Sequence, residues 1–238
     1  STDLTSKIAN SYDSKLKYFR SDKTVDLGMA RRSAINECNS EFICFLDYDD
    51  EYLPKKLELQ LDLMERNDYA LCCGREMLIN ENGKKIFTPK LLINSGYNFG
   101  KLLLKYQIGF QSVMLRKSIL DKEKISFPSD FSFAPDYHLF MSIASKYRIG
   151  VTNSFLVKHR IVKNSLTSQK LERVHIENKK TLDEIFTNNP ELRALYKKEA
   201  DFAYDKIEFY KSVYLISVSN FNEARKIISH IKYKDLRF

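Results

Sequence analysis

Residues 41 to 50 read Glu-Phe-Ile-Cys-Phe-Leu-Asp-Tyr-Asp-Asp. The apolar run 42–46 is short and contains aromatic and β-branched side chains, which is typical of a strand buried on both faces. Asp47, Asp49 and Asp50 follow it at once, and ligands of open α/β sheets bind at this end of such strands. Carboxylate oxygens suit Mg²⁺ or Mn²⁺, and Mg²⁺ is usually held by one or two carboxylates together with substrate phosphates. The stretch therefore predicts a site for a metal-bound diphosphate.

The acidic residues have two other interpretations. An EF-hand loop is excluded, because that loop needs glycine at its sixth position and Tyr52 stands there. A solvated turn between a strand and a helix is the second interpretation, and the sequence alone leaves it open.

Length and charge narrow the class of protein. A chain of 238 residues accommodates one large α/β domain, with or without a helical appendage. The net charge of +8 is spread along the chain, so we expect an anionic substrate or a membrane surface, and no nucleic acid, as partner. The four cysteines form no CxxC pair, which favours free thiols in the reducing cytoplasm.

Hydrophobic periodicity predicts strands that alternate with helices. Helices are expected at 3–11, 26–39, 54–66, 136–147, 202–218 and 222–232, and strands at 15–20, 41–46, 69–73, 109–116 and 151–161. The segment 81–84, Glu-Asn-Gly-Lys, is a hairpin turn signal. The alternation predicts an α/β fold with a mostly parallel sheet flanked by helices, and an almost wholly helical part after Thr167.

Four motifs occur in an order that resembles one known family. They are Gly28-x-Ala30-Arg31, Phe-Leu-Asp47-Tyr-Asp49-Asp50, Ser112-Val-Met-Leu-Arg116 and Pro-Asp136-Tyr-His-Leu-Phe-Met. Together they resemble the bacterial family 2 glycosyltransferases with the GT-A fold. The resemblance implies a GT-A-like glycosyltransferase domain at 1–166 and a helical C-terminal extension at 167–238. The first strand–helix–strand unit of the family has no counterpart, so we expect an N-terminally truncated domain with an exposed sheet edge.

The resemblance also implies roles for the carboxylates. Asp49 corresponds to a ligand of the divalent metal on the donor diphosphate, and Asp47 lies near the donor ribose or the same metal. Asp136 corresponds to the general base that takes the proton from the acceptor hydroxyl. With Pro135 in the first helical turn, Asp136 is expected at the positive end of a helix dipole. The alternative is that Asp136 merely complements that dipole.

Other residues have weaker counterparts. The resemblance places Arg31 near the donor phosphates, where a guanidinium can bind in a bidentate manner, and Gln111 and Ser112 near the donor sugar or the acceptor. His159 corresponds to a segment whose histidine completes the metal shell. The alternatives are an ordinary ion pair for Arg31 and a structural role for His159. Two residues depart from the family pattern, since Arg32 replaces an asparagine and Pro135 replaces an acid.

The resemblance implies a metal-dependent, inverting enzyme that requires Mn²⁺ or Mg²⁺. It would transfer a sugar from a nucleotide diphosphate sugar to a hydroxyl of a glycan or a lipid-linked acceptor, in the cytoplasm or at the inner face of the membrane. Peripheral membrane contact by the C-terminal helices and a homodimer both stay open. The alternative functions are a catalytically inactive sugar- or partner-binding remnant of such an enzyme, and a nucleotidyltransferase.

Overall fold

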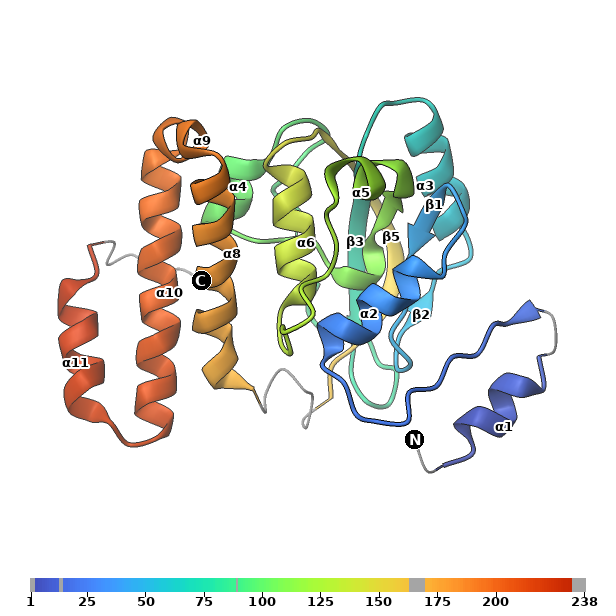
Figure 1. Ribbon diagram of the computed structural model, residues 1–238, viewed down its shortest axis with the longest axis horizontal. Helices are drawn as coiled ribbons and strands as arrows, with labels where there is room; N and C mark the ends of the chain where they lie inside the picture. Colours follow the sequence, from blue (N-terminus) through green and yellow to red (C-terminus); the bar gives the residue numbers. More distant parts are fainter. Residues whose placement is uncertain (1–2, 13–14, 89, 163–169, 233–238) are drawn as a thin grey trace.

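The computed structural model describes residues 3–12, 15–88, 90–162 and 170–232 (Figure 1). The helices and strands follow one another along the chain as α1 (Thr5–Asn10), α2 (Leu27–Asn36), β1 (Phe42–Cys44), β2 (Glu51–Tyr52), α3 (Lys56–Glu65), β3 (Leu71–Ile79), α4 (Phe99–Leu104), the 3₁₀ turn η2 (Phe110–Ser112), β4 (Met114–Arg116), α5 (Lys117–Glu123), α6 (Pro135–Ala144), β5 (Ile149–Arg160), α8 (Leu171–Asn188), α9 (Pro190–Leu195), α10 (Lys197–Ser217) and α11 (Phe221–His230). The predicted α/β class is confirmed.

Five strands form one mixed sheet in the order β1-β4-β3-β5-β2. β5 runs parallel to β3, whereas β4 runs antiparallel to both of its neighbours, β1 and β3, so that β1, β3 and β5 point the same way. β2 pairs antiparallel with β5. The sheet is thus less parallel than the sequence predicts. Direction is a property of the pairing, and the apolar pattern of 109–116 does not specify the direction in which β4 enters the sheet.

One hydrophobic core joins the sheet to the C-terminal helices. Its buried members include residues of strands β3 and β4 and of helices α6, α8 and α10, among them Leu71, Leu115, Leu139, Phe140, Leu182, Phe186, Ala203 and Ile207. Helix α8 packs against α6, and α10 packs against α4 and α8, so α6 lies between α8 and the sheet (Figure 1). The helical part is therefore packed onto the domain that carries the acidic turn. The predicted boundary between residues 166 and 167 lies outside the described residues.

Two predicted strands differ from the structure. Residues 15–20 are irregular, because no described strand lies beside them to supply backbone hydrogen bonds. The predicted strand 109–116 is divided into η2 and β4, and Gly109 precedes the division. A Cβ at Gly109 would lie 1.9 Å from Glu76 Oε1, so the chain there approaches a side chain of β3 too closely for a regular strand residue.

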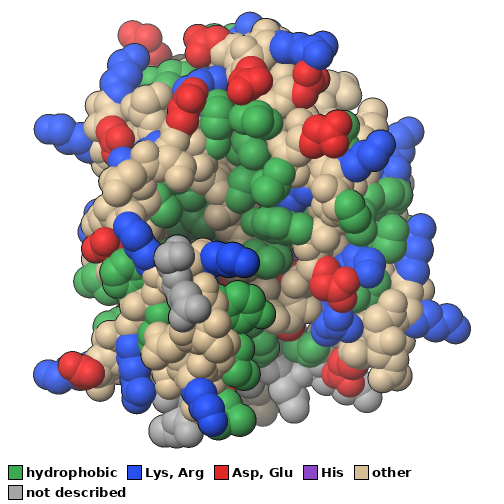
Figure 2. All heavy atoms as spheres, turned by 90° about the vertical axis from the view of Figure 1, so that its right-hand side faces the viewer, with side chains coloured by type: hydrophobic (Ala, Val, Ile, Leu, Met, Phe, Trp, Pro, Cys, Tyr) green, Lys and Arg blue, Asp and Glu red, His purple; other side chains and the backbone are tan. Residues whose placement is uncertain are grey.

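The outer edge of β1 is unpaired within the described residues, where its neighbour is β4. Figure 2 views this side of the molecule and shows a band of apolar side chains between charged ones. Exposed apolar residues of the N-terminal quarter include Leu4, Ile8, Leu16, Phe19 and Val25. In the described part of the chain, no helix is both long and apolar enough to cross a membrane.

Candidate active site

A cleft of about 1060 Å³ opens where β1, β3 and β5 end or bend. Its lining comes from the acidic turn, β3, β5, the start of α6 and the helices α8 and α10. The charged and polar lining residues include Arg31, Asp47, Asp49, Asp50, Glu76, Gln111, Asp136, His159, Arg160 and Lys206. The cleft thus collects nearly all of the residues that the sequence singled out.

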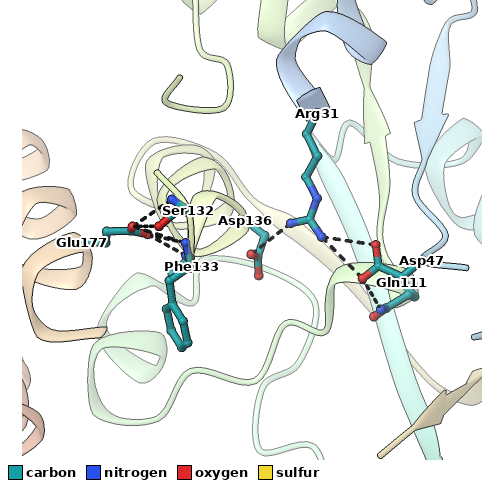
Figure 3. Close-up of polar contacts among 8 residues, drawn as sticks. Arg31, Asp47, Gln111, Ser132, Phe133, Asp136 and Glu177 are labelled. Carbon is teal, nitrogen blue, oxygen red and sulfur yellow. Dashed lines mark hydrogen bonds and ion pairs between the residues drawn. The ribbon is translucent and has the colours of Figure 1, made fainter. Parts of the chain in front are cut away.

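Arg31 bridges the two carboxylates on which the functional prediction depends (Figure 3). Its Nη2 lies 3.3 Å from Asp47 Oδ1, and its Nη1 lies 3.4 Å from Asp136 Oδ1. Gln111 Nε2 donates to the other oxygen of Asp47 at 3.0 Å. The guanidinium also lies over the ring of Phe110, with its carbon 3.5 Å from the ring centroid. The strand-end acid and the helix-start acid therefore face one another across a single cation.

The position of Arg31 follows from the close docking of α2. Gly28 N donates to Phe131 O at 2.9 Å, in the loop that leads into α6. A Cβ on Gly28 would lie 1.9 Å from Pro128 O, so this contact admits only glycine. Arg31 lies one helical turn further along α2, on the side that faces the cleft. The Gly28-x-Ala-Arg31 motif therefore fixes the cation against the segment that carries Asp136.

Asp136 lies in the first turn of α6, directly after Pro135. Burial raises the pKa of its carboxyl, Arg31 opposes this by attraction, and the negative charge of Asp47 raises the pKa further. A carboxylate whose proton affinity is raised is a better general base for a hydroxyl proton than an ordinary aspartate. The geometry therefore suits the predicted base.

Asp49 and Asp50 differ in what they do. Asp50 is only 8% exposed, and its Oδ1 accepts a hydrogen bond of 2.7 Å from Arg160 N at the end of β5. The backbone carbonyl of Asp49 accepts from Arg160 Nε at 3.0 Å, while the Asp49 side chain lines the cleft. Asp50 therefore fastens the acidic turn to the sheet, whereas Asp49 is partly exposed in the cleft.

His159 lies on β5 in the wall of the cleft, with Nδ1 3.2 Å from Glu76 Oε2. The hydrogen bond with Glu76 raises the pKa of His159, although burial opposes it, and Asp50 and Asp49 raise it further. The imidazole is therefore close to the acidic turn, and its Nδ1 contacts the carboxylate of Glu76.

Gln111 and Ser112 are both buried in η2, but of these two only Gln111 lines the cleft. The Ser112 hydroxyl donates to Gly109 O at 2.8 Å and thus closes the turn. The structure therefore separates two neighbours for which the resemblance implies the same role.

The carboxylates of the cleft fit a metal ion that takes its remaining ligands from substrate phosphates and water. Among the described residues, no three His, Cys, Asp or Glu side chains are gathered closely enough to hold an ion on their own. Mg²⁺ commonly uses one or two carboxylates and takes its other ligands from phosphates and water. Asp47 and Asp49, two residues apart in the acidic turn and both in the lining of the cleft, would supply this number of carboxylates.

The sequence did not single out two acids that the structure places at this site. Glu76 lines the cleft from β3, next to a register irregularity between Cys73 and Glu76. Glu177 is buried on α8 and binds the backbone just before α6 (Figure 3). Glu177 lies on the same face of α8 as Val174, Thr181 and Ile185, so helical spacing could have indicated that it faces the core. Only the packing of α8 on α6 shows the backbone amides that it meets there.

Comparisons with known proteins agree with the motifs. The profile described as glycosyl transferase family 2 matches residues 1–122. WfgD of Escherichia coli, named UDP-Glc:alpha-D-GlcNAc-diphosphoundecaprenol beta-1,3-glucosyltransferase, is 30% identical over 197 residues, which are 80% of this chain and 72% of WfgD. An uncharacterised glycosyltransferase of Rickettsia conorii is 28% identical over 221 residues, 86% of this chain, but the chain spans only 36% of that relative.

A solved structure shows the same fold. Residues 1–349 of TarS from S. aureus, in complex with UDP-GlcNAc, superpose with a TM-score of 0.61 at 15% identity, covering 95% of this chain and 78% of that chain. The predicted GT-A-like fold is thereby confirmed. On the family profile and the identity to WfgD, this chain belongs to glycosyl transferase family 2 and is a glycosyltransferase.

Proposed function

We propose that this glycosyltransferase moves a sugar from a nucleoside diphosphate sugar to a hydroxyl of a glycan or of a lipid-linked saccharide, with Asp136 as the general base. The observation that carries the proposal is the arrangement around Arg31, since Asp47 and Asp136 face one cleft from opposite sides of the guanidinium. The names of two similar proteins support the substrate class, because WfgD is named for UDP-Glc and a diphosphoundecaprenol acceptor, and TarS was solved with UDP-GlcNAc.

The reaction needs one base on one face of the donor sugar. The acceptor oxygen attacks the anomeric carbon, its proton passes to a carboxylate oxygen of Asp136, and the bond from that carbon to the phosphate oxygen breaks. The nucleoside diphosphate leaves with that electron pair. A single displacement of this kind inverts the anomeric centre, and the proposal assigns no carboxylate to the role of covalent nucleophile.

Three side chains would bind the donor or its metal ion. Arg31 is placed to bind a phosphate once the donor displaces one of its carboxylate contacts, because a guanidinium fits phosphate in a bidentate manner. Asp49, together with Asp47, would hold Mg²⁺ or Mn²⁺. Such an ion, when bound, neutralises the charge that develops on the leaving diphosphate.

Bound substrates would cover the base further, because the Asp136 side chain is 23% exposed in the cleft of the free protein. Burial already raises the pKa of Asp136, and Phe110 covers the guanidinium that opposes it. Exclusion of water strengthens each charge interaction and protects the donor from hydrolysis.

The test is a screen of nucleoside diphosphate sugars for Mn²⁺-dependent release of the nucleoside diphosphate, with and without lipid-linked and free saccharide acceptors. We expect release with one donor, and loss of metal-dependent UDP binding by calorimetry in Asp49→Ala. The matched control is Asp121→Asn, which removes an exposed acid that pairs with Lys117 far from the cleft. Release of pyrophosphate in place of a nucleoside diphosphate, or metal-dependent binding that Asp49→Ala leaves intact, would contradict the proposal.

A further inference from the structure

Glu177 of α8 is almost fully buried, at 2% exposure, and its carboxylate binds three consecutive backbone N–H groups (Figure 3). Oε1 accepts from Ser132 N at 2.9 Å, and Oε2 accepts from Phe133 N at 3.0 Å and from Ala134 N at 2.7 Å. The Ser132 hydroxyl lies 3.4 Å from Oε1 as well. Three consecutive backbone amides are thus the main partners of this buried carboxylate.

These three residues lead directly into the helix of the base. Ala134 is the N-cap of α6, its side chain makes no capping hydrogen bond, and Pro135, which has no N–H, follows. Asp136 is the next residue. The N–H groups before the helix would be unpaired in a buried environment without Glu177, because the local sequence supplies no cap. The cap therefore comes from a helix more than forty residues away in the sequence.

The same face of α8 holds the rest of this segment. Lys170 Nζ, at the start of α8, donates to Ser132 O at 3.3 Å, and Lys180 Nζ pairs with Asp130. Glu184 Oε2 lies 3.2 Å from His138 Nε2 on α6. Residues 177, 180 and 184 are spaced by three and four, so they share one side of the helix. The backbone before Asp136 and the His138 side chain after it are thus both held by α8.

The segment is also a wall of the cleft. Ser132, Phe133, Ala134 and Asp136 line it together, and Val174 and Asn178 of α8 line the side next to them. A displacement of this wall by about 1 Å is of the size that lowers a rate by about a hundredfold, because attack requires close alignment of the base and the reacting atoms.

We propose that Glu177 is a positioning residue for the catalytic base, and that α8 is thereby part of the catalytic machinery. The inference rests on the proposed function, since it gives Asp136 the role of base. Glu177 touches the backbone that carries the base, whereas the contacts expected for the donor, at Arg31, Asp47 and Asp49, lie on the other side of Asp136. Loss of Glu177 should therefore lower turnover and spare donor binding.

The experiment compares Glu177→Gln and Glu177→Ala with the unaltered chain. Gln keeps the volume but replaces one accepting oxygen with an NH₂ group that faces backbone donors. We expect kcat of Glu177→Gln to fall by about tenfold to a hundredfold and the KM for the donor to stay within about twofold. The acidic limb of the pH profile of kcat/KM should move to lower pH, because burial is what raises the pKa of Asp136 and a loosened segment admits water.

Two controls separate positioning from stability. Met64→Ala empties a fully buried site in the smaller core cluster beside α3, so it destabilises the protein without touching α6 or α8. Glu172→Gln changes a half-exposed acid on α8 itself. Both should keep the kcat and the pH profile of the unaltered chain at a temperature where the proteins are folded.

The outcomes distinguish the two proposals. Wild-type kcat and an unchanged pH profile in Glu177→Gln would overturn the positioning role, even if its unfolding free energy falls. If Glu177→Ala does not fold, Glu177→Gln decides. If the unaltered chain is active but Asp136→Asn is equally active, the proposed function has failed and the positioning role falls with it. If Asp136→Asn is inactive while both Glu177 variants are unimpaired, only the positioning role has failed.

Discussion

Replacement of Arg31 by methionine should move the acidic limb of the pH profile of kcat/KM to higher pH. Arg31 is the cation beside Asp136, and its attraction lowers a pKa that burial has raised. Methionine keeps most of the side-chain volume over Phe110 but carries no charge. The base then stays protonated to higher pH, so the loss of kcat/KM should be largest in acid and smaller as pH rises.

The magnitude follows from the two contacts. The Arg31 side chain is 13% exposed, and its contacts of 3.3 and 3.4 Å are at the long end of the hydrogen-bond range. Hydrogen bonds to charged groups contribute about 1.5–3 kcal/mol each, and the long distances favour the lower value. Asp47 is half-exposed and regains water when it loses its partner, so its contact adds less. We expect the unfolding free energy to fall by about 1.5–3 kcal/mol.

The assay is kcat/KM as a function of pH, together with urea unfolding of the same preparations. Arg31→Lys retains the charge without the bidentate geometry, so its acidic limb should stay near that of the unaltered chain while kcat/KM falls. Arg32→Met removes the exposed neighbouring charge on α2 and should leave the profile unchanged. The reasoning is refuted if the limb of Arg31→Met stays in place or moves to lower pH.

Three other perturbations have defined outcomes. Asp50→Ala should lower the unfolding free energy by about 1–3 kcal/mol, because Arg160 N loses its acceptor. Asp49→Ala should leave the unfolding free energy within about 0.5 kcal/mol and abolish metal-dependent UDP binding. Urea unfolding and calorimetry on both variants check this, and equal losses of stability would contradict it. Gly28→Ala should destabilise the protein by about 1–3 kcal/mol and lower kcat, because its Cβ would meet Pro128 O. The control Gly83→Ala, where the added Cβ has open space around it, should leave kcat unchanged. An active and fully stable Gly28→Ala would show that α2 is docked more loosely than described. Lys56 is 1% exposed and burial lowers its pKa, so the unfolded chain binds more protons than the folded chain as pH approaches the ordinary lysine value of 10.5. The unfolding free energy of the unaltered chain should therefore rise with pH in this range relative to that of Lys56→Met. A difference between the two that is flat or falls with pH would contradict this effect of burial.

The acidic turn and the base helix could be predicted because their signals are local. The apolar run 42–46 ends at Asp47, and Pro135-Asp136 stands before an amphipathic run, so each feature is contained in about ten residues. The structure adds what joins them, since Arg31 contacts residues that are 16 and 105 positions away. Hydrophobic periodicity does not specify which distant residues meet in space. The expectation that Arg31, Asp47 and Asp136 share one site came from the resemblance to a family.

The parts that the sequence did not predict depend on packing. The strand expected at 15–20 has a suitable composition but no neighbour among the described strands, and a strand requires a partner for its hydrogen bonds. Ser112 has the same sequence neighbours as Gln111, yet in the 3₁₀ turn the Gln111 side chain faces the cleft and the Ser112 hydroxyl binds the backbone carbonyl of Gly109. Glu177 lies on the buried face of α8, but its spacing in the sequence does not specify that it meets the backbone before α6.

The central claim is that Asp136 removes the proton from the acceptor. Its most direct test is kcat for transfer by Asp136→Asn, with UDP affinity measured on the same preparation. We expect kcat to fall by about 10²–10⁴-fold, since this is the contribution of general base catalysis, and the affinity for UDP to stay unchanged. A variant that transfers sugar within tenfold of the unaltered rate, or that has lost UDP binding in proportion to its activity, would contradict the account.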